Sequence, residues 1–200
     1  RSRRSVLDAV GRIVRQRGLE GIRVREIAAE AERSPGAVLY HFRKTSDMLF
    51  AVHDDTVRQY VDGRVIAASS SEDPCERLLA VVRAGIPPWA NEDVIRVLYE
   101  MHGLARRSAA HSELLSDLWV REHELYVEII EAGTAIGDFA PVDSAAECAT
   151  RLLALEDGLV LHLIGHNRSF DSQRILQSFV GFAGLQLGCP KLIEVAPASD

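Results

Sequence analysis

The sequence predicts an all-α fold of about nine helices, and three observations support this prediction. Apolar residues recur at helical spacing along most of the chain, no segment alternates apolar and polar residues over the length of a strand, and Gly-, Pro- and Ser-rich stretches separate the helical segments. Of the 200 residues, 47% are hydrophobic and 26% are charged, which is typical of a globular protein with a substantial core.

Three short helices are predicted at the N-terminus. The first spans Arg3–Arg17, where apolar residues recur every three or four positions, and Gly18 ends it. The second spans about Val24–Glu30. The third begins at Ser34, whose hydroxyl can cap free amide groups, and Pro35 occupies the first helical position, where a missing N–H costs nothing.

Six further helices follow, separated by polar or proline-containing breaks. They are predicted at about Asp47–Ala67, Pro74–Gly85, Val94–Arg107, Ser108–Ala132, Ser144–His166 and Ser172–Leu187. The last two are apolar nearly all round, and a helix without a polar face must be buried on several sides. The simplest burial is against the same pair in a second copy, so we expect a homodimer formed through about Ser144–Leu187.

The composition and the motifs exclude several classes of protein. No apolar run reaches the roughly 20 residues of a membrane span, so we expect no membrane partner and a cytoplasmic location. The chain lacks Gly-x-Ser-x-Gly, His-Glu-x-x-His and a glycine-rich phosphate loop, so we expect neither an enzyme nor a cofactor. Cys75, Cys148 and Cys189 are too few and too widely spaced for a disulfide framework or a Cys-x-x-Cys metal site, and are expected to be small packed residues in a reducing compartment.

Charge is distributed unevenly along the chain. Residues 1–47 hold eleven Lys or Arg against six Asp or Glu, whereas residues 48–200 hold twelve against twenty-three. An acidic body is repelled by a polyanion, so contacts with phosphate are expected only in the basic N-terminal part. The expected domains are residues 1–46, which would bind nucleic acid, and residues 47–200.

The second and third predicted helices have the dimensions of a helix-turn-helix. Two helices of about seven or eight residues, joined by a corner of three or four, can set the second helix into a major groove roughly 12 Å wide. Helical corners of this kind are also common in proteins that do not bind DNA, so the neighbouring residues decide how the pattern is interpreted.

Residues 5–50 resemble the DNA-binding domain of TetR-family transcriptional regulators. The matching residues, at the family's spacing, are Arg17-Gly18, Val24-Arg25-Glu26-Ile27-Ala28, Ala31, Ser34-Pro35-Gly36-Ala37-Val38 and Tyr40-His41-Phe42. The resemblance implies that the following residues lie at or near DNA: Arg25, Arg33, Ser34, Pro35, Gly36, Ala37, Leu39, Tyr40, His41, Lys44 and Thr45.

The resemblance also suggests a role for individual residues. Gly36 would let the backbone approach DNA closely, Ala37 could meet a thymine methyl group, and Tyr40 and His41 would donate to phosphates. The alternative for Tyr40 is a buried aromatic residue, and for His41 a histidine that simply ends a helix.

The segment departs from the family pattern at several positions. Glu32 replaces the glycine of the turn and Arg33 the apolar residue after it, while Arg23 replaces a Ser or Thr that could cap the second helix. Thr45 replaces a lysine, which stands one position earlier as Lys44. Leu39 replaces a tyrosine, and its side chain must read a thymine methyl group, pack on sugars or face inward.

From about Pro88 onward the chain resembles the C-terminal domain of the BetI-like branch of the same family, on the segments "RVLYEMHGLARR" and "LEDGL" in particular. This resemblance implies a dimer with a pocket for a small organic effector, whose identity is unknown. Polar and aromatic residues on apolar helix faces are the candidate ligand contacts: Trp89, Tyr99, His102, Trp119, His123, Tyr126, Phe139, Glu156 and Asp157. The acidic residues Glu100, Glu124, Glu128, Glu156 and Asp157 would suit a cationic effector, or would simply be solvated.

His162 and His166 are four residues apart, a spacing that could place two metal ligands on one helix face. No third ligand stands in a convincing motif, so we expect dimer-interface histidines and no metal. The sequence thus favours a ligand-responsive repressor that leaves a palindromic operator on double-stranded DNA when a small molecule binds the C-terminal domain. The alternative is a helical ligand-binding or adaptor protein with no specific DNA target.

Overall fold

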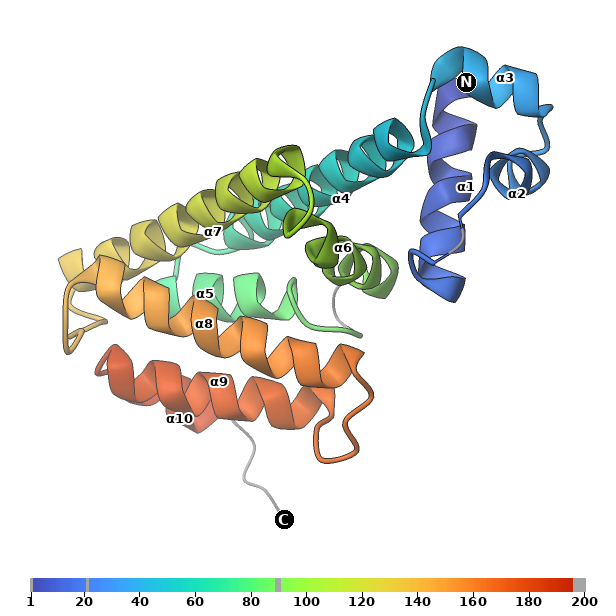
Figure 1. The fold of residues 1–200 in the computed structure, drawn as a ribbon. Helices are drawn as coiled ribbons and strands as arrows, with labels where there is room; N and C mark the ends of the chain where they lie inside the picture. Colours follow the sequence, from blue (N-terminus) through green and yellow to red (C-terminus); the bar gives the residue numbers. More distant parts are fainter. Residues whose placement is uncertain (1, 21, 89–90, 196–200) are drawn as a thin grey trace. The chain divides into compact units, whose positions relative to one another are not determined.

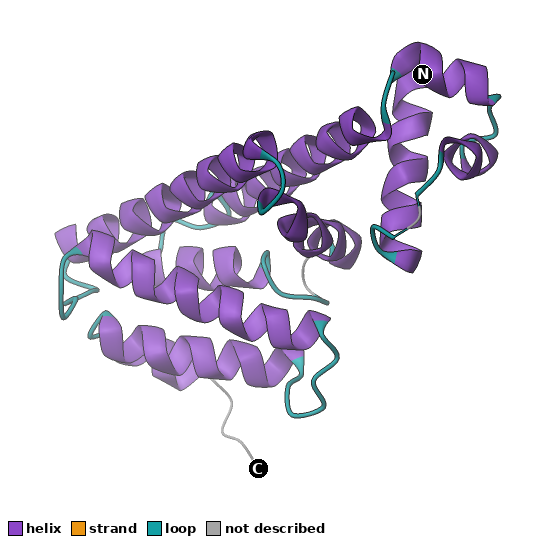
Figure 2. Ribbon diagram, viewed as in Figure 1, coloured by secondary structure: helices purple, strands orange, loops and turns teal. Residues whose placement is uncertain are grey.

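The computed structural model describes residues 2–20, 22–88 and 91–195, and within these ranges the chain forms ten helices and no strand (Figures 1 and 2). The prediction of an all-α fold is confirmed. None of the helices in these ranges has the length and hydropathy needed to cross a bilayer. The chain divides into two compact units, the first made of Arg1–Gln59 and Asp93–Asp117, the second of Tyr60–Glu92 and Leu118–Asp200. The predicted domain boundary at residues 46 and 47 falls inside the first unit.

The first unit contains α1 (Ser2–Arg17), α2 (Val24–Glu30), α3 (Pro35–His41), the first part of α4 (Thr45–Ala68), α6 (Glu92–Ala105) and the start of α7 (Ala109–Ala135). Apolar side chains from the first four helices and from α6 form one core, in which the following residues are fully or almost fully buried: Val6, Val10, Val14, Ile27, Val38, Met48 and Met101. The helix-turn-helix therefore packs on α1 and is supported by a helix distant in sequence.

The second unit contains the rest of α4 and α7, with α5 (Pro74–Arg83), α8 (Ala145–Ile164), α9 (Ser172–Gln186) and α10 (Pro190–Val195). Helices α8 and α9 lie side by side, and α10 folds back on α9 (Figure 1). Side chains that begin these helices satisfy free amide groups, because Asp73, Ser144 and Asp171 each accept a hydrogen bond from the first turn of α5, α8 and α9.

The structure corrects the predicted ends of two helices and adds a third, short helix. Helix α7 continues to Ala135, because Gly133 does not stop the helix but makes room for the Phe139 ring, which would lie 2.2 Å from a Cβ atom at that position. Helix α8 ends at Ile164, two residues before the predicted end at His166. The short helix α10, which begins at Pro190, was not predicted from the sequence.

The corner between α2 and α3 forms without the family's glycine. Glu32 adopts a left-handed conformation with φ of 53°. Its N–H donates to the Ala29 carbonyl (3.1 Å) and the N–H of Arg33 donates to the Ala28 carbonyl (2.8 Å). These two bonds form a Schellman motif, so the backbone at the end of α2 is satisfied and only the side chain of Glu32 is unfavourable in this conformation.

We expect Glu32→Gly to stabilise the protein, since glycine removes the steric cost of a left-handed residue, which is roughly 1 kcal/mol. The glutamate side chain is exposed, so no packing is lost. Thermal and urea unfolding of the variant should show a free energy of unfolding higher by about 0.5–1 kcal/mol. A decrease would mean that the Glu32 side chain makes a favourable contact that outweighs the backbone strain.

Candidate functional site

The first candidate site is the outer face of the helix-turn-helix in the first unit. Val38 and Phe42 are buried and attach α3 to the core. The opposite face of α3 is open, and Tyr40 is 86% exposed, with an edge contact to the His41 ring at a centroid distance of 5.3 Å. An exposed tyrosine offers both its ring and its hydroxyl group for contact, so this face is suited to binding another molecule.

The start of α3 is held by the cap that the sequence predicted. The Ser34 hydroxyl accepts a hydrogen bond from the Ala37 N–H at 3.2 Å, and Pro35 occupies the first turn. A Cβ atom added at Gly36 would find nothing nearer than the Ser34 Oγ atom at 3.9 Å. Packing within the chain therefore does not require glycine at position 36.

The residues predicted to contact DNA all lie on the surface of the first unit. Eight are exposed: Arg25, Arg33, Ser34, Pro35, Gly36, Leu39, Tyr40 and Lys44. The other three, Ala37, His41 and Thr45, are half-buried. The interpretation of Tyr40 as a buried aromatic residue is wrong, and so is the inward orientation of Leu39, which is 44% exposed. Arg23 precedes α2 without a side-chain cap, as expected of a residue that can only donate.

Some arginines of the basic N-terminal part have a structural role instead. Arg12 of α1 donates to the Glu30 carboxylate (2.5 Å) and to the Glu30 backbone carbonyl (3.1 Å), and Arg17 lies 3.7 Å from the Glu26 carboxylate. These pairs join α1 to α2. The exposed cations that remain beside the corner and at the end of α3 include Arg25, Arg33 and Lys44.

A cavity of about 550 Å³ lies in the same unit, between the first turns of α4 and α7 and the end of α6. Its lining includes Phe50, Leu104, Arg107 and His111. The His111 Nδ1 atom is 2.8 Å from the Nδ1 atom of His53, and burial together with His111 lowers the pKa of His53 to about 4. Both rings are thus neutral near pH 7 and form a hydrogen-bonded pair. Of the residues that line the cavity, only those on α6 are close in the sequence to a predicted ligand contact.

The second candidate site is a buried charge cluster in the second unit. The Arg64 side chain, on α4, is only 1% exposed and pairs bidentately with Glu156 of α8, with Nη1–Oε1 and Nη2–Oε2 distances of 2.6 and 2.9 Å. The bidentate pair engages both terminal nitrogens of the guanidinium, whereas its buried Nε atom has no hydrogen-bond partner. In a buried position the pair is much less screened than on the surface.

Two tyrosines complete the surroundings of Arg64. The Tyr126 hydroxyl donates to the Glu156 Oε2 atom at 2.5 Å and accepts from Arg64 Nη2 at 3.0 Å. The Tyr60 hydroxyl accepts from Arg64 Nη1 at 2.7 Å. The guanidinium carbon lies 5.4 Å from the centroid of each ring, so the cation is also held by the two aromatic faces.

Glu122 of α7 brings a second carboxylate to the same cation, at 3.0 Å from Arg64 Nη1. Burial raises the pKa of Glu122 to about 8, and the attraction of Arg64 only partly opposes this because the guanidinium is already neutralised by Glu156. Gly85 closes the cluster from the segment after α5, where an added Cβ atom would lie 2.1 Å from a Glu156 oxygen. The cluster therefore holds one carboxylate more than its cation requires.

Of the predicted ligand contacts, the structure brings only Tyr126 and Glu156 together in this cluster. Both Glu156 oxygens are engaged by Arg64, so the carboxylate could reach a ligand only by exchanging one of these bonds. The other members of the cluster were not predicted from the sequence: Tyr60, Arg64 and Glu122. A signal was present in the i,i+4 spacing of Tyr60 with Arg64 and of Glu122 with Tyr126.

The remaining predicted ligand contacts lie elsewhere. Tyr99 and His102 stack on each other along α6, in the first unit, with ring centroids 5.1 Å apart. Phe139 packs on Gly133 in the core of the second unit, and Asp157 is exposed on α8. Trp89 lies outside the described residues.

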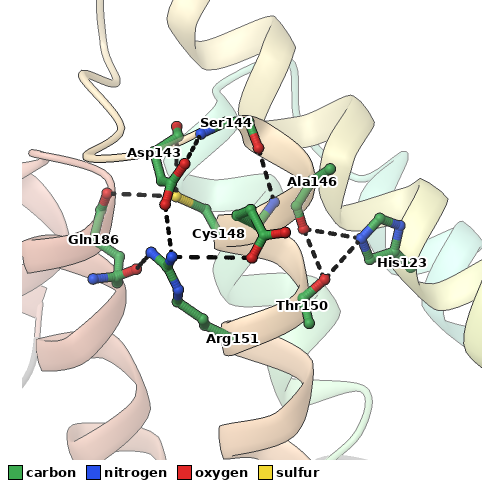
Figure 3. A network of polar contacts seen from close by, with 9 residues as sticks. His123, Asp143, Ser144, Ala146, Cys148, Thr150, Arg151 and Gln186 are labelled. Carbon is green, nitrogen blue, oxygen red and sulfur yellow. Dashed lines mark hydrogen bonds and ion pairs between the residues drawn. The ribbon is translucent and has the colours of Figure 1, made fainter.

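Trp119 and His123 stack along α7, with ring centroids 4.7 Å apart. The His123 Nε2 atom lies 3.0 Å from the Ala146 carbonyl oxygen and 3.2 Å from the Thr150 hydroxyl, which joins α7 to the first turns of α8 (Figure 3). The His123 ring is therefore engaged in contacts within the chain.

Figure 3 also shows how the start of α8 is joined to the end of α9. Arg151 donates to the Asp143 carboxylate (2.6 Å) and to the Gln186 side-chain oxygen (3.2 Å). The bond from Arg151 lowers the pKa of Asp143. Because the group is exposed to solvent, the pair orients the helix ends without carrying much stability.

His162 and His166, whose spacing could have suited a metal site, do not share a helix face. His166 lies beyond the end of α8 in a left-handed conformation with φ of 54°, whereas the His162 ring stacks on Phe170 with a centroid distance of 4.9 Å. Across the described parts of the chain no group of three or more His, Cys, Asp or Glu side chains could hold a metal ion.

Comparison with known proteins identifies both halves of the chain. Residues 6–52 match the model of bacterial regulatory proteins of the tetR family, and residues 74–180 match the model of the BetI-type transcriptional repressor C-terminal domain. The HTH-type transcriptional regulator PksA of Bacillus subtilis (strain 168) is 30% identical over 169 residues, which cover 80% of this chain and 77% of PksA.

Two solved structures have the same fold over nearly the whole chain. A protein from Saccharomonospora viridis, crystallised in complex with choline, has a TM-score of 0.86 and 26% sequence identity, covering 92% of this chain and 96% of the other. A TetR transcription regulator from Haloarcula marismortui has a TM-score of 0.81 and 24% identity, covering 93% and 98%.

We expect the stability of the protein to fall as pH rises from about 6.5 to about 8, because folded Glu122 keeps its proton up to about pH 8 whereas an unfolded glutamate loses it near 4.5. The folded state then binds more protons than the unfolded state. His53, with its pKa lowered from 6.5 to about 4, gives the opposite slope, but only below about pH 6.5.

Urea unfolding at several pH values tests this expectation. In Glu122→Gln, the free energy of unfolding should lose less between pH 6.5 and 8 than in wild type, by an amount on the order of a few kcal/mol. Glu124→Gln, which changes an exposed neighbour, should show the same pH dependence as wild type. An identical slope in wild type and Glu122→Gln would show that Glu122 is ionised in the folded protein.

Proposed function

Since the chain belongs to the TetR family of transcriptional regulators and carries a BetI-type C-terminal domain, we propose that it is a repressor that leaves a palindromic operator when a small organic molecule binds. The observation that carries this proposal is the exposed outer face of α3, with Tyr40 86% exposed beside exposed Arg33 and Lys44. Exposed aromatic and basic side chains on the second helix of a helix-turn-helix are suited to contact phosphates and base edges.

The proposed operator is palindromic because the proposed assembly is a homodimer through about Ser144–Leu187. Apolar side chains remain exposed on both helices of this segment, Leu161 on α8 and Leu185 on α9. A two-fold axis through this pair would present two recognition helices to half-sites one helical turn, roughly 34 Å, apart. A rigid-body change of either subunit would then prevent the two DNA-binding domains from binding at the same time.

The first experiment is the selection of duplex DNA from a random pool by the purified protein at two salt concentrations. We expect a short near-palindrome whose affinity falls steeply with salt, because cationic side chains release counterions from phosphates. Weak, sequence-independent binding at both salt concentrations would contradict the proposal and favour a helical ligand-binding or adaptor protein without a specific DNA target.

A matched pair of glycine variants locates the contact on α3. Gly36→Ala should fold at least as stably as wild type, since space is available for the methyl group and alanine favours a helix, yet should bind the selected DNA about tenfold more weakly by holding the backbone away from it. Gly11→Ala, which also adds a methyl group in open space but on α1, should leave DNA affinity unchanged. Equal affinities for the two variants would exclude a close approach at Gly36.

The proposed effector is a small organic cation bound beside Glu122. Three observations support this class: the surplus carboxylate of the cluster, the two tyrosine faces that already hold a guanidinium, and the choline in the related structure from Saccharomonospora viridis. Because Arg64 occupies the space between the tyrosines, the ligand's charge would be matched by Glu122 as that carboxyl loses its proton.

Choline is the probe that tests this class. We expect it to raise the melting temperature of wild type by mass action and to weaken binding to the selected DNA, with both effects lost in Glu122→Gln and kept in Glu124→Gln. A choline effect that survives in Glu122→Gln would place the cation elsewhere, and no effect of choline in any variant would remove it as an effector.

A further inference from the structure

Two cysteines that are 114 residues apart in the sequence meet in the second unit. The Sγ atoms of Cys75 and Cys189 are 3.1 Å apart. Cys75 lies in the first turn of α5 and Cys189 in the turn that leads into α10. The wide spacing of these cysteines in the sequence gave no indication of this contact.

The backbone on both sides of the pair is held in place. On α5, the Asp73 carboxylate accepts from the Cys75 N–H at 2.8 Å. On the other side, the Cys189 N–H donates to the Gly184 carbonyl at 2.9 Å, and Gly188 has φ of 56° and lies so close to Ala140 that a Cβ atom would be 2.7 Å from the carbonyl oxygen. The sulfur atoms therefore face each other in a fixed arrangement, about 1 Å farther apart than the roughly 2.05 Å of a disulfide bond.

We propose that Cys75 and Cys189 are an oxidation site that small peroxides convert into a reversible intrachain disulfide. The bond requires the two sulfur atoms to approach each other by about 1 Å. The side chains are 5% and 1% exposed, so the oxidant must be small and uncharged, as hydrogen peroxide is, and not a bulky disulfide or electrophile.

The reaction balances with one peroxide. Burial and the neighbouring Cys189 thiol raise the pKa of Cys75 to about 12, so Cys75 keeps its proton until the second step, and the Cys189 sulfur reacts with the peroxide. The Cys189 sulfur takes one peroxide oxygen as the O–O bond breaks, giving a sulfenic acid and a hydroxide ion that leaves as water. The Cys75 sulfur then attacks the Cys189 sulfur, the S–O bond breaks, and the Cys75 proton leaves with the departing oxygen as a second water. Both sulfurs are oxidised and both peroxide oxygens are reduced.

The third cysteine provides an internal control. Cys148 is also buried, but its sulfur lies near backbone carbonyl oxygens, 3.8 Å from that of Asp143 and 3.9 Å from that of Gln186. Neither neighbour can form a bond with an oxidised sulfur. Cys148 should therefore form no disulfide within the chain under conditions that oxidise the pair.

The full chain is treated with hydrogen peroxide, unfolded, alkylated and mapped by mass spectrometry, and the thermal midpoint is measured before and after reduction. We expect a peptide linked through Cys75 and Cys189, an alkylated Cys148, and a midpoint higher by about 5 °C or more in the oxidised protein, because the bond closes a loop of more than one hundred residues. Cys148→Ser should give the same linked peptide, and Cys75→Ser and Cys189→Ser should give none.

Two results would overturn the proposal. One is three alkylated cysteines after peroxide treatment, and the other is a linked peptide that contains Cys148 or joins two chains. The wild-type peptide map decides between these outcomes even where a serine variant folds poorly. The result is independent of DNA and effector binding, so it neither supports nor weakens the proposed repressor.

Discussion

The buried guanidinium of Arg64 is the interaction on which the second unit depends. Removing a cation from water costs several kcal/mol unless partners replace the lost solvation. Here the partners come from separate parts of the chain: Tyr60 on the same helix, Glu122 and Tyr126 on α7, and Glu156 on α8. The cluster thus fixes the relative positions of three helices, and it also explains why the segment after α5 has glycine at position 85, where any side chain would displace the Glu156 carboxylate.

The same cluster is the proposed effector site. One guanidinium faces two carboxylates, and the low polarity of the site makes a second buried negative charge expensive. Glu122 must therefore carry a proton or share another cation. A site whose charge is balanced only by a proton is stable without ligand, yet it gains a favourable interaction when a cation replaces that proton. The hydrogen bonds between Arg64 and Glu156 do not involve Glu122, so the proposed response would keep them.

Local features of the sequence were sufficient to predict the helix-turn-helix, because its elements are specified by residues close to one another. Ser34 and Pro35 begin α3, buried Val38 and Phe42 attach it, and the family assignment confirms the prediction of a DNA-binding regulator and not an enzyme. The charge cluster and the cysteine pair could not be predicted, since both depend on which helix faces meet. An arginine on a buried helical face looks like a surface residue in the sequence until the carboxylates of α7 and α8 are placed against it.

Two departures from the family pattern, Glu32 and Arg23, lie where the backbone supplies its own hydrogen bonds. Glu32 stands in place of glycine, but the Schellman bonds of the corner involve only main-chain atoms, and Arg23 leaves α2 without a side-chain cap while the packing of Ile27 still holds the helix. The stability of the first unit resides in the core between α1, α2, α3 and α6, and the exposed face of α3 contributes little to it. Substitutions on that face should therefore have little effect on folding, whereas the second unit, whose charged partners are buried, should tolerate few changes at its cluster.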